Sequence, residues 1–127
     1  MIVDTSALID SLTGLKRSAK RMRSFIAAGE RLLIPSLVLY EWLRGSRTEE
    51  ELAAQEALMP GARALPFGSE EAAVAARLYR DVPRSRGREI DLAIAAHAVV
   101  RQDKLWTLNL EDFADIPGLM LAFSERS

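Results

Sequence analysis

Three acidic residues interrupt stretches of the sequence that are otherwise apolar. Each is the only charge in its neighbourhood: Asp4 between residues 1–3 and 7–9, Glu41 in residues 37–43, and Asp91 in residues 90–96. An ionised carboxylate in apolar surroundings costs several kcal/mol unless it is paired or bound to a metal. Three such acids on separate segments therefore invite a common explanation.

One common explanation is a divalent-metal site. Carboxylates that converge in one pocket hold Mg²⁺ or Mn²⁺ and leave positions for water and a phosphate oxygen. Such ions promote displacement at phosphorus, which needs no thiol and no histidine. The composition fits this chemistry, because the chain has no Cys and a single His. Disulfides, thiolate zinc sites and two-histidine metal sites are thereby excluded.

Each acid also has a simpler explanation, and these stay open. Asp4 can begin a turn or cap a helix. Asp91 falls in the expected first turn of a helix, where the dipole favours acids. Glu41 lies in the middle of a helix, where its best partner is Arg44 on the next turn.

Short apolar segments alternate with helical patterns along the chain, with capping signals at Ser36, Thr48 and Ser69. Strands are expected at residues 1–3, 32–34, 62–67, 104–108 and 119–123, and helices at 16–28, 36–43, 48–59, 69–80 and 89–101. This alternation predicts an α/β fold with a central, mostly parallel five-stranded sheet flanked by helices. Sites in such sheets form at the carboxyl ends of the strands, where Asp4 and Asn109 are expected to face one crevice.

The length of 127 residues predicts a single domain over residues 1–127. No run approaches the ~20 apolar residues of a membrane span, and the N-terminus has no basic signal region, so we expect a cytoplasmic protein. The net charge of −1 hides an asymmetry: residues 1–47 carry eight Lys or Arg against four acids, and residues 48–127 carry nine against fourteen. A basic surface for nucleic acid is therefore compatible with the near-neutral total.

Four blocks of the sequence resemble the PIN domain, and most closely its VapC-type ribonuclease toxins. They are Asp4-Thr5-Ser6-Ala7-Leu8, Glu41 on the helix after the second strand, residues 91–98 (DLAIAAHA) and residues 106–113 (WTLNLEDF). Their order, spacing and total length agree over the whole chain.

The resemblance implies a role for several residues. Asp4, Glu41 and Asp91 would form the acidic pocket that binds Mg²⁺ or Mn²⁺, with Asp4 and Asp91 as the principal ligands. Two hydroxyl residues, Ser6 and Thr107, would support the pocket. The family often has a fourth acid where this chain has Asn109, whose amide oxygen can still coordinate. This departure puts a second metal in doubt, for which Asp112 can partly compensate.

The resemblance also implies an endoribonuclease that cuts tRNA or rRNA and inhibits translation. The implied partners are the RNA substrate, a cognate antitoxin that occupies the active-site groove, and a second copy in a homodimer. Arg84, Arg86 and Arg88 form a basic loop before Asp91, and we expect them to bind the RNA backbone. The alternative is a solvated connector with Arg88 paired to a pocket acid. His97 is expected to be a packed, hydrogen-bonded core residue.

Other functions remain open at this level. A phosphohydrolase with an aspartate nucleophile would resemble Asp-x-Asp after the first strand, and Ser6 counts against it. A receiver-like phosphoacceptor would carry a Lys at the end of its last strand, whereas Lys104 precedes a strand. A PIN-type RNA-processing nuclease without an antitoxin and a catalytically inactive PIN-like binding module both stay possible.

Overall fold

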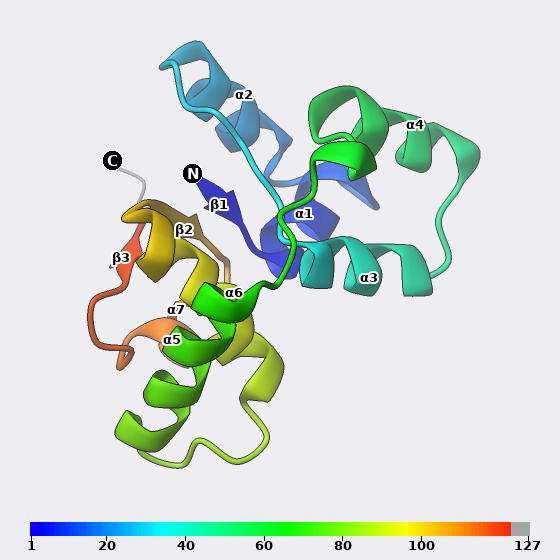
Figure 1. The fold of residues 1–127 in the computed structure, drawn as a ribbon. Coiled ribbons are helices and arrows are strands. Elements are labelled where there is room, and N and C mark those ends of the chain that lie inside the picture. Colours follow the sequence, from blue (N-terminus) through cyan, green and yellow to red (C-terminus); the bar gives the residue numbers. More distant parts are fainter. Residues whose placement is uncertain (123–127) are drawn as a thin grey trace.

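The computed structural model describes residues 1–122, in which short strands alternate with helices (Figure 1). The strands are β1 (Ile2–Val3), β2 (Lys104–Trp106) and β3 (Met120–Leu121). The helices are α1 (Thr5–Leu12), α2 (Ala19–Ala27), α3 (Ser36–Arg44), α4 (Glu49–Leu58), α5 (Ser69–Asp81), α6 (Glu89–Arg101) and α7 (Leu110–Phe113), with a 3-10 turn over Gly61–Arg63. None of these helices is long and apolar enough to cross a membrane.

The sheet is parallel, in the order β1-β2-β3. Two further extended segments continue it beyond β1 through isolated parallel bridges, one between Ile2 and Leu33 and one between Pro35 and Leu65. Five extended segments thus lie side by side, with β1 in the middle. The expected α/β architecture with a parallel sheet is confirmed.

The expectation of five full strands is wrong for the described residues, where three segments are strands. Pro35 has no N–H to continue a ladder, and the segment around it meets its neighbours through single bridges, Leu33 with Ile2 and Pro35 with Leu65. The expected strand 62–67 begins instead as the 3-10 turn. β2 ends at Trp106, before residues 107 and 108. The last expected strand shortens to β3, and its final residue, Phe123, lies outside the described residues.

Most expected helices are present, with corrected ends. α6 spans the expected 89–101, and the capping box of Thr48 and Glu51 is formed at the start of α4. α2 begins three residues late because Gly14 and Lys16 adopt positive φ angles in the preceding turns. The N-caps of α3 and α5 are Pro35 and Gly68, not the expected serines, which become the first helical residues. α1 is the helix that Asp4 was expected to cap, and no bounds were predicted for it or for the short helix α7.

The chain order explains why helices cover both faces of the sheet. From β1 the chain steps outward to Leu33 and then Leu65, and it returns across the sheet to β2 on the other side of β1. With right-handed crossovers, this reversal places α1–α4 on one face and α5–α7 on the other, and Figure 1 shows the two groups on opposite sides of β1. The reversal point lies between β1 and β2, where ligands bind in folds of this type.

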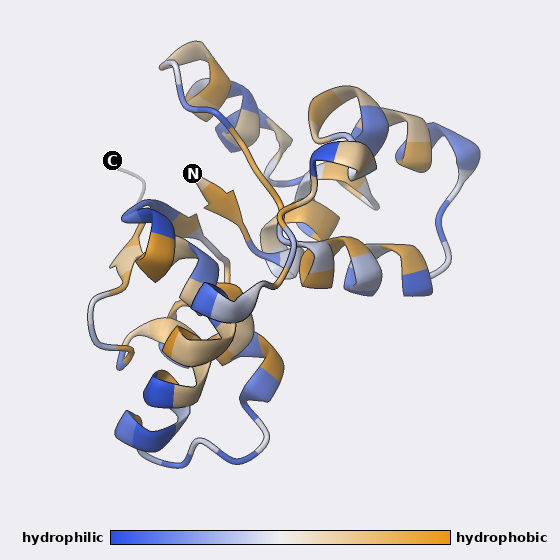
Figure 2. Cartoon of the chain, viewed as in Figure 1, coloured by the Kyte–Doolittle hydropathy of each residue, from blue (hydrophilic) through white to orange (hydrophobic). Residues whose placement is uncertain are grey.

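The sheet forms the centre of the core. Both residues of β1 are fully buried, and this strand is coloured as hydrophobic along its length in Figure 2, whereas α5 alternates between hydrophobic and hydrophilic residues. Trp106 on β2 packs edge-on against Phe25 of α2, with ring centroids 5.1 Å apart.

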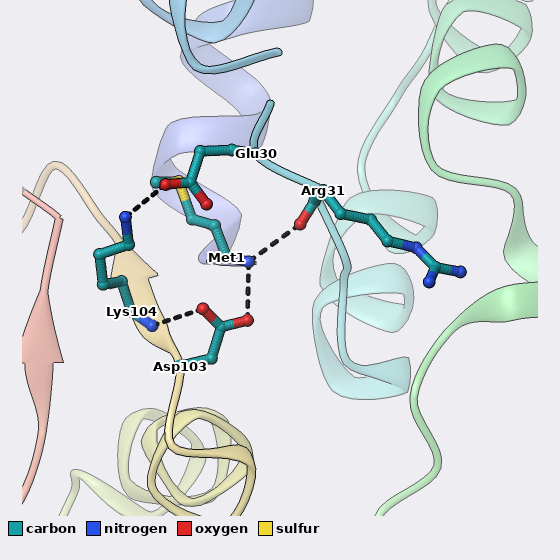
Figure 3. Close-up of polar contacts among 5 residues, drawn as sticks. All are labelled: Met1, Glu30, Arg31, Asp103 and Lys104. Carbon is teal, nitrogen blue, oxygen red and sulfur yellow. Dashed lines mark hydrogen bonds and ion pairs between the residues drawn. The ribbon is translucent and has the colours of Figure 1, made fainter. Parts of the chain in front are cut away.

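A polar network fastens the amino ends of the strands (Figure 3). The N-terminal ammonium group of Met1 donates to Oδ2 of Asp103 at 2.7 Å and to the carbonyl oxygen of Arg31 at 2.9 Å. The backbone N–H of Lys104 donates to Oδ1 of Asp103 at 2.8 Å, and the Lys104 side chain pairs with Glu30. These contacts join β1 to both of its neighbours at the end of the sheet opposite Asp4.

Candidate active site

A pocket of about 560 Å³ lies beyond the carboxyl end of β1. It is lined by residues from the starts of α1, α6 and α7 and the end of α3: Asp4, Thr5, Ser6, Ile9, Glu41, Arg44, Gly45, Asp91 and Asn109. The structure therefore brings together the three acids that the sequence analysis singled out, together with Ser6 and Asn109.

Asp4 is held by two hydroxyl groups. It occupies the N-cap position of α1, but its side chain makes no capping hydrogen bond. Its Oδ2 instead accepts from Ser6 Oγ at 2.8 Å and from Thr107 Oγ1 at 2.7 Å. These two hydrogen bonds fix the orientation of the side chain. The residue is also buried, with only 4% of it exposed. The explanation of Asp4 as a simple helix cap is wrong.

The same two hydroxyls also position the segment after β2. Leu108 N–H donates to Ser6 Oγ at 3.0 Å, and Asn109 N–H donates to Thr107 Oγ1 at 3.0 Å. Each hydroxyl thus donates a hydrogen bond to Asp4 and accepts one from a backbone N–H. This relay places Asn109, the N-cap residue of α7, on the wall of the pocket.

Glu41 faces the pocket from the last turns of α3. Its Oε1 accepts from Thr5 Oγ1 at 2.6 Å, and its Oε2 lies 3.5 Å from the guanidinium of Arg44. The expected pair with Arg44 is present, but the Arg44 side chain is 59% exposed, so the pair contributes little. Thr5 had no predicted role, although its position directly after Asp4 is a signal that would have identified it.

Asp91 carries an unfavourable charge. It lies in the first turn of α6. Burial, and then the negative charges of Asp4, Asp112 and Glu41, raise the pKa of its carboxyl group to about 6, with only Arg88 opposing. Stabilisation by the helix dipole does not by itself account for this residue, because the net effect of its surroundings disfavours the ionised form.

The remaining expected site residues lie outside the pocket lining. Asp112 is exposed on α7, and its negative charge contributes to the raised pKa of Asp91. Arg88 forms a bidentate ion pair with Asp115, in which Nη1 lies 3.1 Å from Oδ2 and Nη2 lies 2.7 Å from Oδ1. Its guanidinium group also donates to the backbone carbonyl oxygens of Pro83 and Asp112. Its partner Asp115 does not line the pocket, so the alternative in which Arg88 pairs with a pocket acid is wrong.

Two further expectations concern Arg84, Arg86 and His97. Both arginines are exposed on the loop before α6, and neither is in an ion pair with any of residues 1–122. His97 is buried and packs against Phe67, with ring centroids 6.0 Å apart. The expected hydrogen bond is wrong for its Nε2, which has no partner in the described part of the chain, and burial lowers its pKa.

The donor set of the pocket consists of oxygen atoms, which suits a hard cation. No group of three or more Asp, Glu or His side chains within residues 1–122 is gathered closely enough to hold an ion alone. Mg²⁺, however, uses one or two carboxylates and keeps several waters. The pocket also holds an excess of negative charge, which the raised pKa of Asp91 records. The residues present therefore fit a hydrated divalent cation.

Comparisons with known proteins agree with this architecture. The PIN domain model matches residues 1–119. The chain is 34% identical over 120 residues to ribonuclease VapC19 of Mycobacterium tuberculosis, covering 93% of this chain and 95% of that one. It is also 34% identical over 129 residues to ribonuclease VapC1 of Rickettsia felis, covering 94% and 92%. The crystal structure of DNA-bound VapBC from Salmonella typhimurium is similar, with a TM-score of 0.77, 25% identity and 95% of each chain covered. The chain belongs to the PIN-domain family and, within it, to the VapC group.

Proposed function

We propose that this protein is a metal-dependent endoribonuclease, the toxin of a toxin–antitoxin pair. The observation that carries the proposal is the convergence of Asp4, Glu41 and Asp91 in one pocket at the switch point of the sheet. Its relatives named ribonucleases support RNA as the substrate. We further propose that it acts in the cytoplasm on tRNA or rRNA and thereby inhibits translation.

In this proposal, Asp4 and Asp91 would be the principal residues that hold Mg²⁺ or Mn²⁺, and Glu41 and the Asn109 amide oxygen would supply the other oxygen donors of the pocket. Such an ion promotes hydrolysis by making water more acidic and by stabilising negative charge on the phosphate. Ser6 and Thr107 keep Asp4 in one orientation through hydrogen bonds to Oδ2. Thr5 does the same for Glu41. A site with a neutral Asn109 in place of a fourth acid favours one ion over two.

The test is cleavage of a total cellular RNA pool with Mg²⁺ or Mn²⁺, comparing the parent with Asp4→Asn and Asp91→Asn. We expect cleavage by the parent, loss in EDTA, and a decrease of at least about a hundredfold in both variants. Glu89→Gln, which removes an exposed acid from the first turn of α6 outside the pocket, is the matched control and should retain activity. Full activity in both Asp variants, or no metal-dependent cleavage, would refute the proposal.

An antitoxin is the second part of the proposal, supported by the structural likeness to VapBC complexes. A groove of about 660 Å³ runs between α2 and α4, with an apolar floor that includes Leu12, Met22, Ile26 and Leu58. Such a groove suits the apolar face of a partner helix. The antitoxin would enter here and extend its C-terminal segment into the active-site pocket. Ala54→Arg, on α4 at this groove, should prevent co-purification with the product of an adjacent small reading frame but leave RNA cleavage unchanged.

A homodimer is the third part. Tyr40 and Leu43 are 56% and 52% exposed and lie three residues apart on α3, which makes an apolar surface. Light scattering should give the mass of two chains for the parent and of one chain for Tyr40→Glu combined with Leu43→Glu. A monomeric parent at micromolar concentration would contradict this part.

A further inference from the structure

A second pocket lies directly beside the carboxylate pocket. It has a volume of about 340 Å³ and is lined by Arg17, Ser18, Arg21, Trp106, Thr107, Leu108, Leu110 and Ala122. Thr107 connects the two pockets, because it lines the second while its hydroxyl donates to Asp4 in the first. Residues 107–110 therefore contribute to both pockets, with Asn109 in the first and Thr107, Leu108 and Leu110 in the second.

The two arginines of this second pocket have no carboxylate partner among residues 1–122. Arg17 lies in the turn before α2 and Arg21 in the first turn of the helix, and both are exposed. Cations are unfavourable near a helix N-terminus, and the first turn of α2 contains no acid. The Asp10 carboxylate contacts this end through Ser18 Oγ and offsets part of the positive charge, but it does not line the pocket.

The position of these arginines separates them from the proposed antitoxin groove. That groove is lined by residues of the α2 region such as Lys16, Ala19 and Arg23, whereas Arg17 and Arg21, four residues apart, face the other pocket. One helix thus presents an apolar face to the groove and a basic face to the end of β2. The two surfaces can be altered independently.

We propose that Arg17 and Arg21 form a phosphate-binding subsite for single-stranded RNA next to the carboxylate pocket. This inference rests on the proposed nuclease function. A guanidinium group binds a phosphate through bidentate hydrogen bonds. In this proposal, each of the two arginines binds one of two successive phosphates of the strand. Leu108 and Leu110, 44% and 40% exposed, offer apolar contact to a ribose or base, whereas Trp106 is buried and offers no stacking platform. The subsite therefore binds RNA backbone with little base preference.

The experiment measures binding of a fluorescein-labelled, single-stranded 12-nucleotide RNA in EDTA by anisotropy, at several salt concentrations. The proteins are the parent, Arg17→Ala combined with Arg21→Ala, and a control with Arg77→Ala and Arg80→Ala, which removes two exposed arginines from α5. Loss of two phosphate contacts should weaken binding roughly tenfold and lower the slope of log Kd against log salt by about 1.4. Arg17→Lys combined with Arg21→Lys should restore most of the slope.

The α5 control should have the affinity and salt slope of the parent. The inference is overturned if the alanine pair also binds like the parent, or if the control is weakened as much as the alanine pair. Circular dichroism of each variant establishes that its fold is unchanged. Cleavage assays separate this inference from the proposed function. Cleavage that depends on Asp4 with an unchanged salt slope overturns the subsite alone. A reduced slope in a protein that never cleaves RNA supports the subsite and refutes the nuclease.

Discussion

The hydroxyl group of Thr107 donates to Oδ2 of Asp4 at 2.7 Å, although 103 residues separate them in the chain. The bond crosses from the end of β2 to the end of β1, the two parallel strands between which the strand order reverses. The orientation of the Asp4 carboxylate therefore depends on β2 lying next to β1 in the sheet.

We predict that Thr107→Val, which keeps the shape and removes the hydroxyl, lowers RNA cleavage roughly 10- to 100-fold, as loss of a residue that orients a ligand does. It should also destabilise the fold by about 1–3 kcal/mol, because the buried Asp4 loses a donor and Asn109 N–H loses its acceptor. Thr107→Ser retains the hydroxyl and should restore both. RNA cleavage assays and thermal unfolding test these two effects. Wild-type cleavage by Thr107→Val would contradict the role of Thr107 in orienting Asp4.

Asp91→Asn should abolish cleavage and yet stabilise the metal-free protein at pH 8. Because the folded pKa of about 6 lies above the ordinary 3.8, the ionised carboxylate begins to destabilise the fold as pH rises through this interval. The expected gain above pH 6 is roughly 1–2 kcal/mol after allowance for solvent screening, and it vanishes below pH 4.

The measurement is the Tm of parent and variant in EDTA from pH 4 to pH 8. Glu89→Gln on the same helix turn is the control, since this acid is exposed and lies outside the pocket. A variant that is less stable than the parent at pH 8 would show that Asp91 is not repelled by its neighbours. Added Mn²⁺ should raise the Tm of the parent and leave that of Asp91→Asn nearly unchanged.

Arg88→Ala should weaken the fold more than it weakens RNA binding. The guanidinium ties the start of α6 to the end of α7 through Asp115, and this pair raises the pKa of Arg88 and lowers that of Asp115. We expect a lower Tm, a lower kcat and an unchanged Kd for single-stranded RNA. Arg84→Ala combined with Arg86→Ala should show the reverse pattern, a weaker Kd with an unchanged Tm. If both variants lost RNA affinity equally, Arg88 would be shown to bind RNA, which would contradict the prediction.

Asp103→Asn should destabilise the protein at pH 7 but not at pH 2. Burial alone would raise the pKa of this carboxyl group, but the hydrogen bonds from the N-terminal ammonium and the Lys104 N–H outweigh it, and the net pKa is lowered. A lowered folded pKa contributes stability that is present above the ordinary value of 3.8 and is lost as pH falls through the folded value. Thermal unfolding of both proteins from pH 2 to pH 7 measures this difference, and Asp81→Asn at the end of α5 is an exposed control.

The sequence was enough to predict the type of fold and the chemical kind of site. Acids isolated in apolar stretches are detectable without coordinates, because burying a lone charge is costly wherever the chain folds. Asp4, Glu41 and Asp91 were found in this way, and the alternation of strands and helices indicated the sheet that collects them. α6 was predicted to its ends because its helical pattern is long and buried.

Features that depend on distant partners required the tertiary structure. Arg84 and Arg88 lie on the same basic loop, and the sequence alone does not show that only Arg88 pairs with Asp115. Five expected strands became three because ladder length depends on the neighbouring segment, not on local apolar content. The hydroxyls that hold Asp4 and the arginine pocket beside it arise where β1, β2 and α2 meet. By itself the sequence determined which groups must be buried together; the packing of those elements decided which partners each group has, because hydrogen bonds and ion pairs require contact within a few ångströms.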